Sequence, residues 1–155
     1  MSSEAATALI LEVFRLNGRL LAAGDRLVSK LGLTSARWQA LGAIALSPTP
    51  EPVARLARNM GLNRQGLQRI LNELAEAGIV AFQENPHHRR AKLVVLTQKG
   101  RDVYGAASRL QVPWVNSLSR GLEAESILAV SSILRALRER LEKEDKISRR
   151  VEERG

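Results

Sequence analysis

The sequence predicts a mainly α-helical fold with one small β-hairpin, and three observations predict it. Over most of the chain, apolar residues recur every three or four positions, which is the spacing of one helix face. Only the segment 79–96 differs, because two short runs of β-branched or aromatic residues flank a polar stretch there. Glycines and one proline-rich stretch separate the segments, without a long linker or an internal repeat. We therefore expect a single domain over 1–155.

The first expected helix covers 4–31 and carries two adjacent apolar stripes. They consist of Leu9, Val13, Leu16, Leu20, Leu27 and Leu31, and of Ile10, Phe14, Leu21 and Val28. One stripe is enough to pack a helix on its own core, so two stripes indicate burial on two sides. Contact with a second subunit is therefore expected along this helix.

A second helix is expected after Gly32, which ends the first one. Thr34 or Ser35 can cap it by accepting a hydrogen bond from an otherwise unpaired amide, and it continues through LGAIAL. The next stretch, SPTPEP, is rich in proline, which suits a loop and a first helical turn but not a helix interior.

Two more helices are expected with only a short turn, Gly61 and Leu62, between them. The first covers about 52–60, and the second follows Asn63, which can cap it, and ends at Gly78. The inner face of the second helix is apolar, with Leu67, Ile70, Leu71 and Leu74.

The hairpin and two long helices complete the chain. IVAFQE and KLVVL predict two strands around NPHHRR, and Thr97 can cap a helix from about Gln98, which Pro113 should kink. Gly121 breaks that helix, and the last helix is expected from about Leu122 to the mid-140s. Its apolar residues have coiled-coil spacing, with Ile127, Val130, Leu134, Leu137 and Leu141. The charged end EDKISRRVEERG is expected to fray.

Composition excludes several classes of protein. The chain has no Cys, so it has no disulfide, no thiol redox sensor, no cysteine nucleophile and no thiolate metal site. It has no apolar run of about 18 residues, and no basic region precedes its first apolar stretch. We expect a soluble, cytoplasmic protein without membrane contact.

The net charge of +8 is concentrated in one third of the chain. Residues 51–101 contain nine Arg and Lys against four Glu, which is a local excess of five positive charges. A polyanion is therefore the expected partner, and a basic surface that serves only solubility is the alternative.

The order of the central elements is that of a winged helix-turn-helix: a helix, a glycine turn, a capped second helix and a hairpin with a basic tip. The start of the second helix carries outward positions Arg64, Gln65, Gln68 and Arg69. In this motif that part of the helix enters the DNA major groove, where Arg matches guanine and Gln matches adenine. Exposed Arg and Gln are often only a solvated surface, but the basic hairpin beside them favours DNA.

Four pieces of the sequence resemble the multiple-antibiotic-resistance regulator (MarR) family of bacterial transcription factors. They are LTSARWQAL, LARNMGLNRQ, NELAEAGIV and NPHHRRAKLVVLTQKG, in that order, and the similarity covers nearly the whole chain. The resemblance implies a DNA-binding lobe at 34–98 and dimerisation helices at 4–31 and 98–146. It also implies an obligate homodimer that binds a pseudo-palindromic operator in double-stranded DNA and commonly represses a nearby gene.

The resemblance also gives expected site residues. The predicted DNA-binding set is Asn63, Arg64, Gln65, Gln68, Arg69, His88, Arg89, Arg90 and Lys92, with Arg90 as the main wing contact. Many members of the family release DNA when a small, often aromatic and anionic, effector binds between the dimerisation helices and the DNA-binding lobe. The residues considered for lining such a pocket are Trp38, Tyr104 and Trp114, and core packing is the alternative for each.

His88 departs from the family pattern. Relatives often carry Asp two positions before the wing arginine, where it orients that arginine. A neutral imidazole can accept a hydrogen bond, but a protonated one repels Arg90. We therefore expect a wing that is less fixed in the free protein and a grip on DNA that depends on pH.

Other functions have weaker support in the sequence. A metal site at His87 and His88 lacks a third ligand, because these are the only two histidines and there is no Cys. No glycine-rich phosphate loop or isolated carboxylate pair points to catalysis, so no catalytic residue and no cofactor are expected. The remaining alternative is an architectural DNA binder or a protein-interaction module without effector control.

Overall fold

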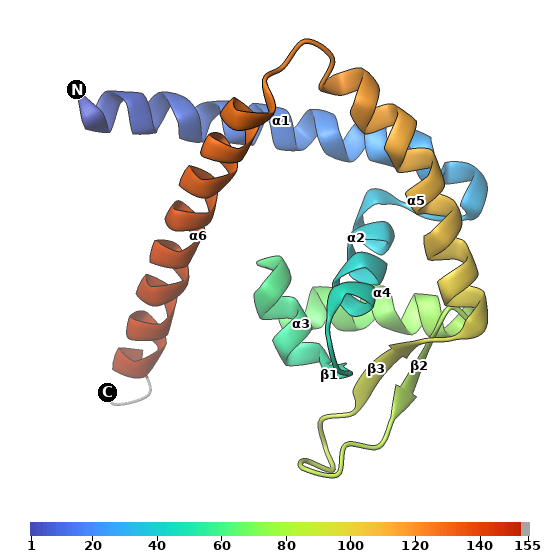
Figure 1. Cartoon of the computed structure of the whole chain (residues 1–155). Coiled ribbons are helices and arrows are strands. Elements are labelled where there is room, and N and C mark those ends of the chain that lie inside the picture. The colour runs from blue at the N-terminus through green and yellow to red at the C-terminus, as the bar shows by residue number, and fades with distance from the viewer. Residues whose placement is uncertain (153–155) are drawn as a thin grey trace. The chain divides into compact units, whose positions relative to one another are not determined.

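The computed structural model describes residues 1–152 and is mainly helical, with one small three-stranded antiparallel sheet (Figure 1). This confirms the predicted fold class. The chain divides into two compact units, Met1–Trp114 and a second one from Val115 onward. The first unit contains the sheet and the aliphatic core, whose largest fully buried side chains are Leu41, Leu56, Leu67, Leu71, Leu74, Val28 and Val94.

Helix α1 covers Ser2–Val28 and is tightly joined to helix α2, Ser35–Leu46. The last turn of the predicted first helix is a separate 3-10 turn, η1 (Ser29–Leu31), which ends at Gly32 in the left-handed conformation. The buried Ser35 fixes the joint: its amide donates to Asp25 Oδ1 at 2.7 Å and its hydroxyl donates to the Leu21 carbonyl at 2.7 Å. Of the two expected caps, Thr34 accepts the hydrogen bond from the Arg37 amide.

Helices α3 (Val53–Met60) and α4 (Arg64–Glu76) form the predicted helix-turn-helix. Gly61, with a φ of 66°, makes the turn possible because a left-handed backbone strains residues that have a Cβ. Asn63 caps α4 as predicted, and its Oδ1 accepts a hydrogen bond from the Gly66 amide at 2.6 Å. In α4, Leu67, Leu71 and Leu74 are buried, so the opposite face of this helix is left for solvent or a ligand.

The sheet contains the two predicted hairpin strands, β2 (Val80–Gln83) and β3 (Leu93–Leu96), and a third strand that was not predicted. Strand β1 (Glu51–Pro52) lies beside β3, with Glu51 opposite Val94 and Pro52 opposite Leu93. The expectation of a loop and a first helical turn here is therefore wrong in part. Proline has no amide hydrogen to donate, but β1 is an edge strand, where proline is tolerated.

Helix α5 (Gln98–Leu118) begins at the predicted cap and continues through Pro113. The Thr97 hydroxyl accepts a hydrogen bond from the Gly100 amide at 3.0 Å and donates to the Gly78 carbonyl at 2.6 Å. One side chain therefore starts α5 and ties it to the turn that follows α4.

Helix α6 covers Ala124–Glu152 and is longer than predicted. The charged stretch that was expected to fray is helical as far as Glu152, and residues 153–155 lie outside the described part. Glu, Lys and Arg are good helix formers, and charge pairs such as Arg138 with Glu142, at 3.4 Å, add support one turn apart.

Within 1–152, no helix is long and apolar enough to span a membrane.

Candidate nucleic-acid interface

The exposed face of α4 carries the predicted recognition residues. Arg64, Gln65 and Arg69 are exposed, and Gln68 is half-buried. Asn63 has a structural task as well, since its carboxamide oxygen holds the first turn of α4. The sequence places a glycine at 66, and the cap gives a reason for it: a Cβ there would lie 3.0 Å from Asn63 Oδ1.

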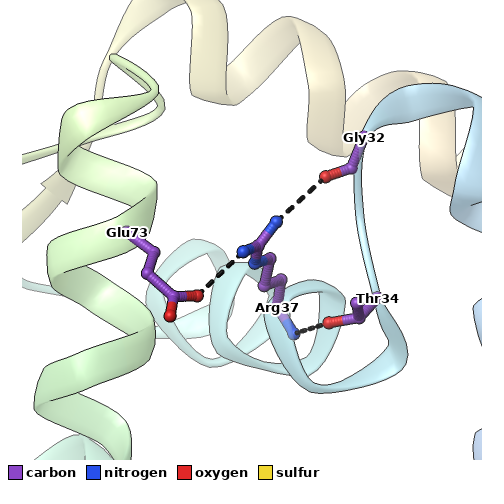
Figure 2. Close-up of polar contacts among 4 residues, drawn as sticks. All are labelled: Gly32, Thr34, Arg37 and Glu73. Atoms are coloured by element: carbon purple, nitrogen blue, oxygen red, sulfur yellow. Dashed lines mark hydrogen bonds and ion pairs between the residues drawn. The ribbon is translucent and has the colours of Figure 1, made fainter.

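The far half of α4 is held to α2 by an ion pair, shown in Figure 2. Arg37 Nη2 donates to Glu73 Oε2 at 2.8 Å, and Arg37 Nη1 donates to the Gly32 carbonyl at 3.4 Å. Both side chains remain more than a third exposed, so the pair stabilises the fold by no more than about 1 kcal/mol. It connects α4 with the corner where α1 passes into α2.

A groove of about 650 Å³ separates the first turns of α4 from the wing loop, residues 84–92 between β2 and β3. Five predicted site residues line it together: Arg64, Gln68, His88, Arg90 and Lys92. Figure 1 shows the wing loop projecting beyond strands β2 and β3. The groove therefore joins two elements that are about 20 residues apart in sequence into one basic surface. Gln65, Arg69 and Arg89 are exposed but do not line this groove.

In the part of the chain that the structure describes, the side chains at the wing tip have no partner that holds them. Within residues 1–152, no hydrogen bond or ion pair engages the side chains of His88, Arg89, Arg90 or Lys92. His88 therefore does not hold Arg90 by a hydrogen bond among the described residues, and the expectation of a less fixed wing stays a prediction. The charged groups of Arg90 and Lys92, which line the groove, are therefore available to an anion that enters it.

Asn72 is a lining residue that the sequence reasoning missed. Its Oδ1 accepts a hydrogen bond from Gln68 Nε2 at 2.9 Å, one helical turn away. Among the described residues, the carbonyl oxygen of Gln68 and its second amide hydrogen have no other partner, and these two groups are the donor–acceptor pair that adenine recognition needs. The i, i+4 spacing of two amides was the signal in the sequence. The remaining lining residues, also unpredicted, are Pro52, Val53, Ala54, Phe82 and Ala91.

The aromatic residues considered for an effector pocket lie at the core margin. Trp38 and Tyr104 are half-buried and pack against the core of the first unit. The rings of Trp38 and Trp114 are tilted by 50° with centroids 6.4 Å apart, which is a favourable aromatic geometry. The structure therefore brings the two tryptophans together.

Comparison with known sequences identifies relatives over most of the chain. The model of the MarR family matches residues 31–91. Over 137 residues the chain is 35% identical to an uncharacterized protein of Mycobacterium bovis, Mb2034c, and the match covers 88% of this chain and 94% of that protein.

Comparison with solved structures identifies the same fold. The transcriptional repressor CouR, bound to a 23-mer DNA duplex, matches with a TM-score of 0.74 at 22% identity, over 88% of this chain and 96% of that one. CouR from Rhodococcus jostii RHA1, bound to p-coumaroyl-CoA, matches with a TM-score of 0.74 at 21% identity, over 81% and 88%. The Mycobacterium tuberculosis transcriptional regulator MOSR, in complex with DNA, matches with a TM-score of 0.68 at 24% identity, over 83% and 94%. With its helix-turn-helix, its basic wing and these relatives, the chain belongs to the MarR family of DNA-binding transcription regulators.

Proposed function

We propose that this protein is a homodimeric repressor that reads a pseudo-palindromic operator through α4 and the wing. The observation that carries the proposal is the groove in which Arg64 and Gln68 of α4 face His88, Arg90 and Lys92 of the wing loop. A surface with helix-borne Arg and Gln on one side and the basic wing on the other suits a duplex, which offers base edges beside phosphates.

The two sides of the groove take different roles in this proposal. Arg64, Gln65, Gln68 and Arg69 lie in the first two turns of α4 and read base edges in the major groove. The wing residues Arg89, Arg90 and Lys92 hold flanking phosphates or enter the adjacent minor groove. Base contacts supply sequence preference, whereas phosphate contacts supply affinity and register.

The homodimer is supported by apolar side chains that a single chain leaves in solvent. On α1, these exposed residues are Ile10, Leu11, Val13, Phe14, Leu16, Leu20 and Leu21. On α6, they are Ile127, Leu128, Val130, Ile133 and Leu141. Contiguous exposed apolar faces of this kind mark interaction surfaces, and a second copy of the chain is the occupant we propose. A two-fold axis would then present two α4 helices about 34 Å apart, the spacing of one DNA turn.

Release by a small molecule completes the proposed function. The solved complex of CouR with p-coumaroyl-CoA supports an aromatic, anionic effector class for this chain as well. Such an effector would favour a dimer whose α4 helices no longer match the operator spacing. Trp38, Tyr104 and Trp114 are the residues proposed to sense it.

The function is tested by selecting fragments of genomic DNA that the purified protein binds and sequencing them. A regulator enriches a few fragments that share an inverted repeat with half-sites about 10 base pairs apart. If all fragments are recovered equally, and affinity depends on salt concentration but not on sequence, the protein is an architectural DNA binder instead.

The effector is tested by intrinsic fluorescence, because Trp38 and Trp114 are the only tryptophans in the sequence. Titration with hydroxycinnamic acids and their coenzyme A thioesters should change the emission and, over the same concentration range, release the selected operator. Operator release without any change in emission would place the effector away from this aromatic pair.

A further inference from the structure

The wing loop is held by a buried side chain that the recognition argument does not use. Asn85 is only 9% exposed, although the loop around it is largely in solvent. A buried carboxamide is costly unless its donors and acceptors are satisfied, so its partners indicate what it does.

Asn85 ties the two ends of the loop together. Its Nδ2 donates to the Ala91 carbonyl at 2.9 Å, and its Oδ1 accepts from the His87 amide at 3.0 Å. Its backbone carbonyl accepts from the His88 amide at 3.2 Å, and the Ala91 amide donates to the His88 carbonyl at 3.1 Å. The Asn85 side chain thus joins the two ends of the segment 85–91. The two backbone hydrogen bonds form two successive turns within that segment, 85–88 and 88–91.

Arg89 and Arg90 lie inside the segment that Asn85 closes. Their side chains have no hydrogen bond or ion pair within the described residues. The position of each side chain therefore depends on the backbone conformation of the loop. A loop that is ordered before binding loses less conformational freedom when it meets DNA, and this raises affinity.

We infer that Asn85 is the positioning residue for the wing: its carboxamide bridge from His87 N to Ala91 O presents Arg90 to the phosphate backbone. The inference rests on the proposed function, in which Arg90 contacts DNA. It also assigns the orienting role to a group that does not titrate.

The effect of the Asn85 hydrogen bonds on the wing loop is tested in the free protein by amide hydrogen exchange. Asn85→Ala should accelerate exchange at the His87 and His88 amides while the amides of α4 keep their protection. Asn116→Ala, which removes an exposed carboxamide from α5, is the matched control and should leave the wing unchanged. Unchanged exchange at His87 in Asn85→Ala would overturn the inference without reference to DNA.

The consequence for binding is tested by a double-mutant cycle on the selected operator across a range of salt. Asn85→Ala should weaken binding about three- to tenfold and flatten the salt dependence toward that of Arg90→Ala. The double variant should bind nearly as Arg90→Ala does, because Asn85 acts through that arginine. Additive losses with an unchanged salt slope would overturn the positioning role.

Two outcomes separate this inference from the proposed function. If the wild-type protein shows no operator preference, the proposed function fails, whatever Asn85 does. If wild-type preference and the Arg90→Ala effect are both present but Asn85→Ala binds as the wild type does, only the inference fails. Should Asn85→Ala not fold, Asn85→Asp keeps an acceptor for the His87 amide, loses the donor to Ala91 and adds a negative charge, so it is examined by hydrogen exchange in the free protein and not by DNA binding. It should then show fast exchange near Ala91, and full protection there would overturn the bridge.

Discussion

Arg64 and Arg90 reach the same groove from different elements, and their chemistry separates their roles. Arg64 begins a rigid, capped helix, whereas Arg90 stands on a loop and has no protein partner within the described residues. We expect Arg64→Ala, or Arg69→Ala on the same helix, to weaken specific binding by about 1–3 kcal/mol and to relax the preference at one base position. Selection of bound sequences with each variant measures both effects.

Arg90→Ala should act differently from the α4 variants. It should weaken binding to operator and unrelated DNA alike and reduce the slope of log affinity against log salt by about one. Titrations at several salt concentrations provide the check. If Arg90→Ala altered base preference while Arg64→Ala only flattened the salt slope, the two roles would have to be exchanged.

His88 gives the site a predicted dependence on pH. Protonation adds a positive charge to a groove that already holds Arg64, Arg90 and Lys92. Repulsion among these groups is screened because the wing is exposed, whereas a phosphate of bound DNA would attract the added charge. Operator affinity should therefore be severalfold higher at pH 6 than at pH 8 in the wild type and in His87→Ala. His88→Ala should lose the difference; equal affinities at both pH values in wild type and His88→Ala alike would sink the idea.

Single residues show where the sequence was informative. The caps at Thr34, Asn63 and Thr97 were predictable because a short polar side chain just before a helix commonly accepts a hydrogen bond from an amide of the first turn. The roles of Asn72 and Asn85 were not, because each depends on a partner whose position only the fold sets.

At the scale of elements, the start of α5 is packed against the start of β2 with no room for a side chain. A Cβ on Gly100 would lie 2.0 Å from the Ile79 carbonyl oxygen, which belongs to the backbone and cannot rotate away. Gly100→Ala should therefore lower the free energy of unfolding by about 1–3 kcal/mol, measured by urea denaturation.

The same helix offers a matched control for Gly100. A Cβ on Gly105 would meet only Arg109 Nη1, at an ordinary 3.6 Å. Gly105→Ala should raise the free energy of unfolding by about 0.5–1 kcal/mol, because alanine loses less entropy in a helix. Equal effects of the two substitutions would mean that the close approach at Gly100 is not a constraint.

The ion pair between Arg37 and Glu73 is expected to contribute little to stability. A double-mutant cycle with Arg37→Ala and Glu73→Ala should give a coupling of about 0.2–1 kcal/mol, since water screens both groups. A coupling above about 2 kcal/mol would show that the pair is a main support of α4.

Helices and strands with a clear period were predictable, and those set by distant contacts were not. The helix-turn-helix and the hairpin follow from local apolar spacing and glycine turns. Strand β1 is two residues long and forms only because β3 lies beside it, so no local sequence pattern predicts it. The helical end of α6 was not predicted, because a run of charges is typical of a solvated tail although Glu, Lys and Arg are also good helix formers.

At the scale of the whole molecule, the proposed dimer depends on the apolar face of α1. Phe14 is 70% exposed in the single chain, and a carboxylate there would have to be buried in the dimer. Phe14→Glu should reduce the mass in solution from twice 17.1 kDa to 17.1 kDa, as light scattering measures. Operator affinity should fall about 100-fold or more, because two half-sites are no longer bound by one particle.

The control for this prediction lies on the polar side of the same helix. Ala8 is exposed on the face that carries Glu12, Arg15 and Arg19, so Ala8→Glu should leave both mass and affinity unchanged. A wild-type mass of 17.1 kDa at concentrations where the operator is bound would contradict the dimer.

The most direct measurement is the ratio of affinities for a selected operator and for an unrelated duplex of equal length, both at physiological salt. A sequence-specific regulator should show a ratio of about 1,000 or more, which Arg64→Ala lowers while the protein stays folded. A ratio near one, with binding that falls steeply as salt rises, would contradict the claim that α4 and the wing read sequence.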